Sequence, residues 1–179
     1  MLPQIRSSVV VLVLLSIAFL ARAQETSCKL NALLPSVRAV VEEKFPGWRL
    51  VNVFDLRSDD QSLWKKSHHG ECPGLAVGHY ENDSDNSYAI TLFQKPPKLR
   101  QLLIVITPGL STPKLHVLSR PQEVAYLSVV SKLPPGRYAD AEGKALKIDK
   151  ESISYEAIEA GAIMYYYSEG RYQSIQSSE

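Results

Sequence analysis

Residues 102–106 read Leu-Leu-Ile-Val-Ile, an apolar run with no alternation of hydrophobic and polar side chains. A strand of this type is buried on both faces, so the run predicts a central strand of a sheet. Turn-forming residues bound it on both sides, with Pro96-Pro97 before it and a turn rich in Pro and Gly over 107–113 after it. The partners of this strand are therefore sought in the flanking sequence.

Strand patterns occupy most of the chain around this run. Residues 75–80 and 87–94 flank a polar stretch and predict one hairpin, and residues 162–167 and 172–175 predict another. Further strands are predicted at 48–54, 115–118, 124–130 and 153–157. Tyr138 and residues 144–148 flank the Gly-containing loop 140–143 and predict a third hairpin. Because no long helix separates these strands, the sheet is expected to be mostly antiparallel.

Two helices are predicted before the first hairpin. Pro35 suits the first turn of a helix, apolar residues from Val37 onward follow at helical spacing, and Pro46-Gly47 ends the pattern. Residues 58–61 read Ser-Asp-Asp-Gln, a capping-box pattern, and predict a short helix near 59–66. The expected fold class is α+β, a mostly antiparallel sheet with one N-terminal helix and a second short helix packed on it.

The start of the chain has the pattern of a secretory signal peptide. Arg6 supplies a positive charge, residues 9–20 form an unbroken apolar run, and Ala21-Arg22-Ala23 matches the small-x-small cleavage pattern. A membrane anchor is the alternative, but a spanning helix needs about 20 apolar residues and this run is shorter. We expect residues 1–23 to be removed and residues 24–179 to form a single domain, secreted or periplasmic, without membrane insertion.

The charge balance argues against a polyanionic partner. The chain of 179 residues has 20 Lys and Arg and 19 Asp and Glu. Removal of Arg6 and Arg22 with the signal peptide would leave 18 basic against 19 acidic residues, a net charge of −1. No basic surplus is then available to neutralise phosphates, so nucleic acid is not expected as a partner.

Cys28 and Cys72 are the only cysteines. In an exported chain an even number of cysteines favours a disulfide, which here would tie the N-terminal segment to the central region. A catalytic thiol is the alternative, because His68 and His69 lie shortly before Cys72 and a thiolate nucleophile needs a nearby base. The disulfide is the preferred interpretation.

The sequence contains no motif of a known catalytic or cofactor site. It has no His-Glu-x-x-His, no Gly-x-Ser-x-Gly elbow and no glycine-rich phosphate or dinucleotide loop, so neither metal nor cofactor is expected. Asp59-Asp60 and the pair Asp83 and Asp85 lie in turns, where aspartate commonly bonds to the backbone. His116 is expected to point away from the core face of its strand.

Tyr165, Tyr166 and Tyr167 are the most unusual feature of the sequence. Alternation along a strand places Tyr165 and Tyr167 on one face and Tyr166 on the other. An exposed tyrosine is typical of binding surfaces, whereas aromatic pairs with Tyr172 across the hairpin would serve stability alone. Trp64, which precedes two lysines, either extends such a binding surface or anchors the short helix.

Two short stretches resemble known families. Residues 43–48, Glu-Lys-Phe-Pro-Gly-Trp, resemble the junction from helix to strand in the first unit of PepSY-like domains. Residues 74–89 are similar to the loop of FG-GAP-type repeats, which binds calcium through acidic residues in that family. His79 and Ser87 stand where that pattern has carboxylates, which leaves Glu81 and Asp83, whereas calcium takes about six to eight oxygens.

The chain as a whole resembles a group of small exported bacterial proteins of unassigned function. The shared elements are Phe-Pro-Gly-Trp at 45–48, Glu-Cys-Pro-Gly-Leu at 71–75, Pro-Pro-Gly-Arg-Tyr at 134–138 and the tyrosine-rich hairpin at 165–172. This resemblance implies no catalytic residue.

We therefore expect an exported, non-enzymatic domain that binds a protein or a component of the cell envelope through a face of its sheet. The candidate binding residues are Trp64, His68, His69 and Tyr166. Two alternatives stay open. One is a hydrolase-type enzyme with its site near His68 and His69, and the other is a calcium-stabilised module that uses the loop Glu81–Asp85.

Overall fold

Antiparallel strands and a few short helices make up the molecule. The computed structural model describes residues 28–95, 97–110 and 112–177, so the predicted signal peptide lies outside the described residues. The fold is α+β with mostly antiparallel sheets, as predicted. The helical segments are the α-helices α2 (Pro35–Lys44) and α3 (Ser58–His68) and the 3₁₀-helices η1 (Leu30–Ala32) and η2 (Val53–Asp55).

The strand β4 (Arg100–Thr107) lies at the centre of a five-stranded sheet, sheet A. Its neighbours are β3 (Ser87–Gln94) on one side and β5 (Lys114–Glu123) on the other. The short strands β1 (Arg49–Leu50) and β2 (Leu75–Gly78) both pair with β3. Every residue of β4 after Arg100 is buried, which confirms the prediction of a central strand.

The second half of the chain forms sheet B and a separate hairpin. Sheet B has the order β11-β10-β9-β6, and its strands are antiparallel. The strands β7 and β8 pair only with each other in the described residues and form a two-stranded hairpin, sheet C, beside sheet B. The bounds are β6 (Val129–Leu133), β7 (Gly136–Ala139), β8 (Ala145–Ile148), β9 (Ser152–Ala157), β10 (Gly161–Ser168) and β11 (Arg171–Ser177).

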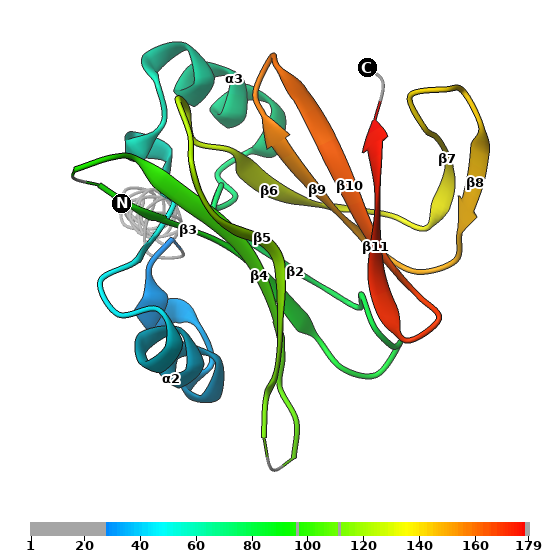
Figure 1. Cartoon of the computed structure of the whole chain (residues 1–179), viewed down its shortest axis with the longest axis horizontal. Helices are drawn as coiled ribbons and strands as arrows, with labels where there is room; N and C mark the ends of the chain where they lie inside the picture. Colours follow the sequence, from blue (N-terminus) through cyan, green and yellow to red (C-terminus); the bar gives the residue numbers. More distant parts are fainter. Residues whose placement is uncertain (1–27, 96, 111, 178–179) are drawn as a thin grey trace, which may run out of the picture.

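Sheet A has a cover on each face (Figure 1). The helix α2 packs on one face, where its Val37 and Val41 join a cluster that includes Ile104 of β4. Sheet B packs on the opposite face, where Leu103 and Val105 of β4 belong to a second cluster. Alternate side chains of β4 thus enter different cores, which explains why the strand has no polar face.

The helix α3 packs against sheets A and B through the side chain of Trp64. This indole is 2% exposed and packs in a third cluster with Phe93 and Val129. Its Nε1 donates a hydrogen bond of 2.9 Å to the backbone oxygen of Glu71. The helix ends at His69, whose φ of 44° is left-handed. No helix in the described part of the chain combines the length and apolar character needed to cross a membrane.

Cys28 and Cys72 form the predicted disulfide, and neither cysteine is free. Cys72 is buried just before β2 in the core that α2 shares with sheet A. The bond therefore attaches the segment that precedes η1 and α2 to the middle of the chain, as the sequence predicted.

Two predicted strands are shorter in the structure, and one is longer. Of residues 48–54 only Arg49–Leu50 is a strand, because Asn52 caps η2 by accepting a 3.2 Å hydrogen bond from the Phe54 N–H. The strand predicted at 124–130 begins at Val129. The side chain of Gln101 holds the preceding residue, Ser128, through its backbone N–H and C=O at 2.8 and 2.6 Å. The strand predicted at 115–118 extends over all of β5.

Candidate functional site

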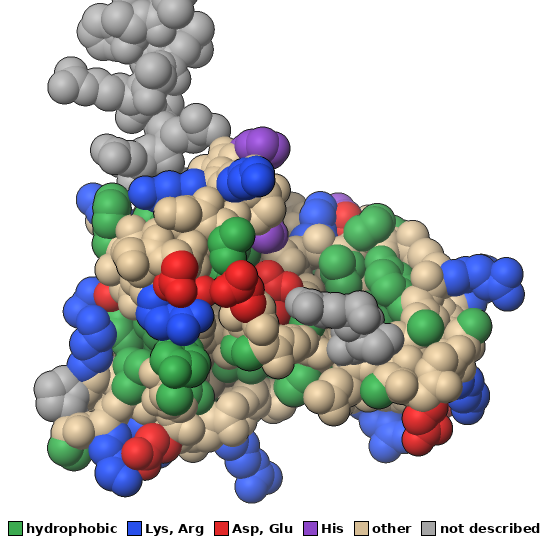
Figure 2. All heavy atoms as spheres, turned by 90° about the horizontal axis from the view of Figure 1, so that it is seen from above, with side chains coloured by type: hydrophobic (Ala, Val, Ile, Leu, Met, Phe, Trp, Pro, Cys, Tyr) green, Lys and Arg blue, Asp and Glu red, His purple; other side chains and the backbone are tan. Residues whose placement is uncertain are grey.

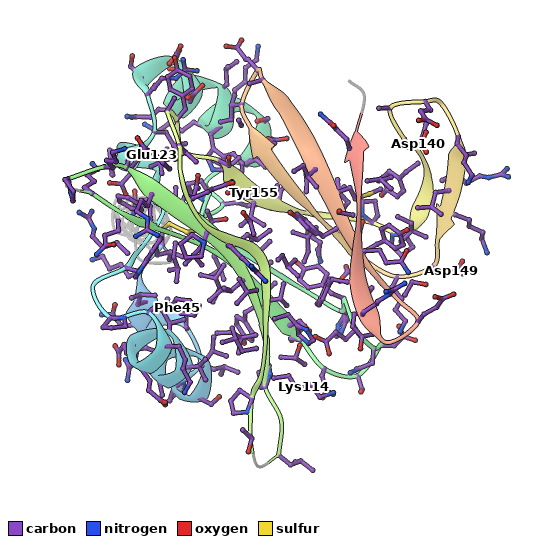
Figure 3. The ribbon with its side chains drawn as sticks, in the orientation of Figure 1. Phe45, Lys114, Glu123, Asp140, Asp149 and Tyr155 are labelled. Carbon is purple, nitrogen blue, oxygen red and sulfur yellow. A yellow bond between two sulfur atoms is a disulfide. The ribbon has the colours of Figure 1, made fainter. Side chains whose placement is uncertain are left out.

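A cavity of about 440 Å³ lies between β5 of sheet A and β11 of sheet B. In Figure 3, Lys114 and Glu123 mark the two ends of β5, and Tyr155 lies between the sheets. The cavity is lined by Leu115, His116, Val117, Leu118, Tyr165, Tyr172, Gln173 and Ser174. We call this cavity the groove, and β5 and β11 are the strands that border it. Its lining is aromatic, aliphatic and polar, and contains no Lys, Arg, Asp or Glu.

Both strands that border the groove are sheet edges. In the described residues β5 pairs only with β4, and β11 pairs only with β10. Residues 115–117 pair with 104–106 on their inner side and have no strand on the other. An edge of this kind carries backbone N–H and C=O groups that are free to pair with another chain.

The part of β5 that borders the groove lacks the usual protection of an edge strand. Natural edges are commonly blocked by charged residues or proline. The far half of β5 has these features in Arg120, Pro121 and Glu123. The four residues that line the groove, Leu-His-Val-Leu over 115–118, have none of them, although Lys114 precedes them at the start of β5.

The carboxylate of Glu81 lies buried beside the groove. Its side chain is 4% exposed, and Oε1 accepts a hydrogen bond of 2.8 Å from the Thr107 hydroxyl. The Tyr172 hydroxyl donates to the same oxygen at 3.4 Å. Ser87 and Thr107 also share a hydroxyl contact of 2.7 Å. Strands β4 and β11 thus bring neutral hydroxyl groups to one buried carboxylate, and Ser87 of β3 contacts the first of them.

His116 joins Glu81 to the groove. Its Nε2 lies 3.3 Å from Glu81 Oε1, without the alignment of a hydrogen bond, and its side chain is 33% exposed. Its ring meets the Tyr172 ring edge to face at 5.2 Å. His116 points away from the core face of its strand, as expected. Sheet A is covered on both faces, so Leu115 enters the α2 core and the next residue turns toward sheet B.

Burial keeps the tyrosines around Glu81 protonated. Burial, and then the negative charge of Glu81, raise the pKa of Tyr172 well above its ordinary range. Burial, with the charge of Glu151, does the same to the pKa of Tyr80, whose hydroxyl has no hydrogen-bond partner in the described residues. Burial raises the pKa of Tyr155 to about 12. A phenol is protonated at neutral pH even at its ordinary pKa of about 10, and of these three hydroxyls that of Tyr172 donates to Glu81.

Glu151 forms a separate charged contact near the end of β2. Burial opposes its ionisation, but the 2.8 Å contact from the Lys132 ammonium and the 2.6 Å hydrogen bond from the His79 backbone N–H outweigh it. The pKa of this carboxyl is therefore lowered. This second acid has a cation as its partner, which distinguishes it from Glu81.

The candidate residues named from the sequence occupy two separate places. Trp64 and His68 stack at 3.6 Å between ring centroids, and His69 follows at the end of α3. Trp64 is buried, so it anchors its helix, which is one of the two roles expected for it. Tyr166 lies on β10 and donates a hydrogen bond of 3.0 Å to Gln173 of β11. The structure does not join these four residues into one site.

Tyr166 faces away from the groove. Tyr167 pairs with Tyr172 across the hairpin and stacks edge to face with it at 5.1 Å, while Tyr166 pairs with Gln173. Tyr166 lines a different cavity of about 590 Å³ beside β8, together with Leu146 and Ile148. The two faces expected for the tyrosine run are therefore present, and the second is partly covered by sheet C.

The acidic loop does not gather its carboxylates. The ligand oxygens of Glu81, Asp83 and Asp85 do not converge, because Glu81 turns inward while Asn82 binds the backbone N–H groups of Ser84 and Asp85 at 2.8 and 2.7 Å. In the described residues one acidic group does converge, made by Asp59, Asp60 and Glu159. Asp60 in that group already pairs with Arg57 through two hydrogen bonds of 2.8 and 2.9 Å.

Acidic and basic side chains are interspersed over the face that carries α3 (Figure 2). Hydrophobic side chains form small groups among them on this face. This distribution agrees with the near-neutral charge of the chain and offers no continuous basic surface on this side for a polyanion.

Comparison of the chain with protein families, with curated proteins and with solved structures finds no match. The groove was not among the sites named from the sequence. Glu81 was grouped there with the acidic loop, and Tyr172 was considered only as a hairpin partner. The convergence of the β2–β3 connection, β5 and β11 on one point depends on sheet packing, which no local pattern contains.

Proposed function

We propose that the protein is an exported binding domain that holds an extended segment of another polypeptide in the groove between β5 and β11. The segment adds to the edge of one or both sheets by backbone hydrogen bonds, and its alternate side chains enter the cavity. This is a specific form of the expectation that the chain binds a protein through its sheet. It requires no catalytic residue.

The observation that carries the proposal is that two unpaired sheet edges border one cavity. A strand laid along either edge would lie about 4.8 Å from it and would satisfy its backbone groups. The stretch of β5 that lines the cavity, residues 115–118, contains no Lys, Arg, Asp, Glu or Pro, and Lys114 lies just before it. Tyrosine and histidine in the lining combine an apolar body with a polar tip, as is common at binding surfaces.

The Cys28–Cys72 disulfide supports the proposed export. Disulfides form and persist in oxidising compartments and are rare in the reducing cytosol. An exported domain also meets extended segments of other envelope or secreted proteins.

The two alternatives named from the sequence have less support. His68 is stacked on Trp64, and neither His68 nor His69 lines the groove or the cavity beside β8. The calcium alternative needs Glu81 to act with Asp83, whereas Glu81 already binds Thr107 and Tyr172. The catalytic thiol is excluded by the disulfide.

The test is a selection of peptides of about ten residues, the length of a long strand, against the purified protein with its disulfide intact. Selected peptides are then resynthesised with single N-methylated residues, and their affinities are measured by fluorescence anisotropy. Each edge hydrogen bond contributes about 0.5–1.5 kcal/mol. N-methylation should therefore weaken binding about threefold to tenfold at every second residue and have little effect between them.

Two variants locate the binding face. Tyr172→Ala removes a ring from the groove and should weaken binding, whereas Tyr166→Ala acts on the other face of the same hairpin and should leave affinity unchanged. The proposal fails if no peptide is selected, or if the N-methyl scan shows no alternation. It also fails if Tyr166→Ala is the variant that abolishes binding.

A further inference from the structure

We propose that the groove selects segments that place a Lys or Arg side chain against Tyr165, Tyr172 and His116, with the buried carboxylate of Glu81 as its counter-charge. This inference rests on the proposed function and names the chemistry of the occupant. Four observations carry it, concerning charge, aromatic lining, the histidine and the absence of a competing cation in the lining.

Glu81 is a buried acid without an ordinary cation. Its carboxylate has neutral hydroxyl donors in Thr107 and Tyr172, and no Lys or Arg of the described residues pairs with it. The Lys150 ammonium is close, but donates to the backbone oxygen of Glu81 at 2.6 Å. A buried carboxylate is costly unless it is paired, so it favours a positive group nearby. Glu81 does not itself line the cavity, but His116 and Tyr172, which contact its carboxylate, both do, so a cation in the groove approaches it through these two rings.

The lining on this side of the groove suits an organic cation. Tyr165 and Tyr172 both line the cavity, and the Tyr172 ring is held by edge contacts with His116 at 5.2 Å and Tyr167 at 5.1 Å. An ammonium or guanidinium group is attracted to the face of a tyrosine ring, more strongly where water is excluded. Since the lining contains no Lys or Arg, nothing in it repels a cation while His116 is neutral.

His116 connects the groove to the buried carboxylate. Its ring lines the cavity, and its Nε2 lies 3.3 Å from Glu81 Oε1. The charged groups around the pair are Glu81 from the β2–β3 connection and Lys150 from the segment before β9. A cation that rests on His116 and Tyr172 therefore lies on the side of the groove that faces the charge of Glu81.

The first test uses the unaltered protein and a selected peptide with one position varied. Lys, Arg, Nε-acetyl-lysine and norleucine are placed at the position that enters the cavity. Acetylation keeps the length of lysine and removes its charge. We expect Lys and Arg to bind about tenfold more tightly than the two neutral residues, and we expect free arginine not to compete.

Variants provide the second test. Glu81→Gln should remove the preference for Lys over acetyl-lysine but retain binding of the norleucine peptide. Glu151→Gln, a second acid that already has the partner Lys132, should retain the preference.

The outcomes separate the two proposals. Equal binding of Lys and acetyl-lysine by the unaltered protein overturns the cation site, while strand addition stands. Competition by free arginine at the affinity of the peptide would also overturn it, since the ligand would then be a small cation and not a polypeptide. Failure to select any peptide overturns the proposed function itself. The first comparison needs no variant, so it holds even if Glu81→Gln does not fold.

Discussion

Reduction of the Cys28–Cys72 disulfide should lower the free energy of unfolding by about 4 kcal/mol. The bond joins residues that are 44 apart in sequence. The loop-entropy relation for a loop of this length gives about 4 kcal/mol at 25 °C, at the upper end of the usual range. Globular proteins are stable by only about 5–15 kcal/mol, so this loss is a large share of the total.

The assay is urea unfolding followed by tryptophan fluorescence, with and without reductant. With a slope of about 2 kcal/mol per molar urea, the midpoint of the reduced protein should lie about 2 M lower. The double variant Cys28→Ala/Cys72→Ala is the matched control, and it should behave like the reduced protein and ignore the reductant. Equal midpoints for the oxidised and reduced protein would refute the reasoning, because the cross-link would then constrain nothing in the unfolded chain.

Other predictions concern the core and the ionisable groups. Trp64→Ala should cost about 3–5 kcal/mol in urea unfolding, whereas Phe54→Ala, at a side chain that is 72% exposed, should cost less than about 1 kcal/mol. Equal costs would contradict the anchoring role of the indole. The lowered pKa of Glu151 contributes stability above the pKa of the unfolded chain, and this contribution is lost as the pH falls through the folded pKa. The stability difference between the natural protein and Glu151→Gln should therefore shrink in acid, and a constant difference would argue against the Lys132 contact. The raised pKa of Tyr172 has the opposite consequence. The unfolded chain releases this proton near pH 10 and the folded chain does not, so stability should fall above about pH 10. Tyr172→Phe should reduce that decline, and an unchanged decline would place its cause elsewhere.

Local patterns were sufficient for most of the fold. The apolar run at 102–106 identified the central strand, and Pro35 and Pro46-Gly47 marked the two ends of α2. The even number of cysteines predicted the disulfide. Each of these signals depends on residues that lie close together in sequence, or on composition alone. The strand at 124–130 was misplaced because a distant side chain, that of Gln101, fixes the backbone of Ser128.

The candidate site depends on contacts that no local pattern encodes. Glu81 and Tyr172 are 91 residues apart, and they meet only because sheet B packs on sheet A. The contact of His116 with Glu81 could not be predicted for the same reason. A single strand shows which side chains alternate, but not whether both of its faces are covered. A useful signal was nevertheless present, since β5 combines Arg120, Pro121 and Glu123 in one half with the uncharged stretch 115–118 in the other.

The cross-link also separates the chain into the loop that it closes and the part that lies outside that loop. Every helical segment of the described chain, from Leu30 to His68, lies between the two bonded cysteines, and all of sheet B lies outside that loop. A reductant should therefore loosen the helical cover while the strands after Leu75 keep their protection against hydrogen exchange. In a reducing environment the helices would thus become less ordered, while the sheets that border the groove would stay assembled.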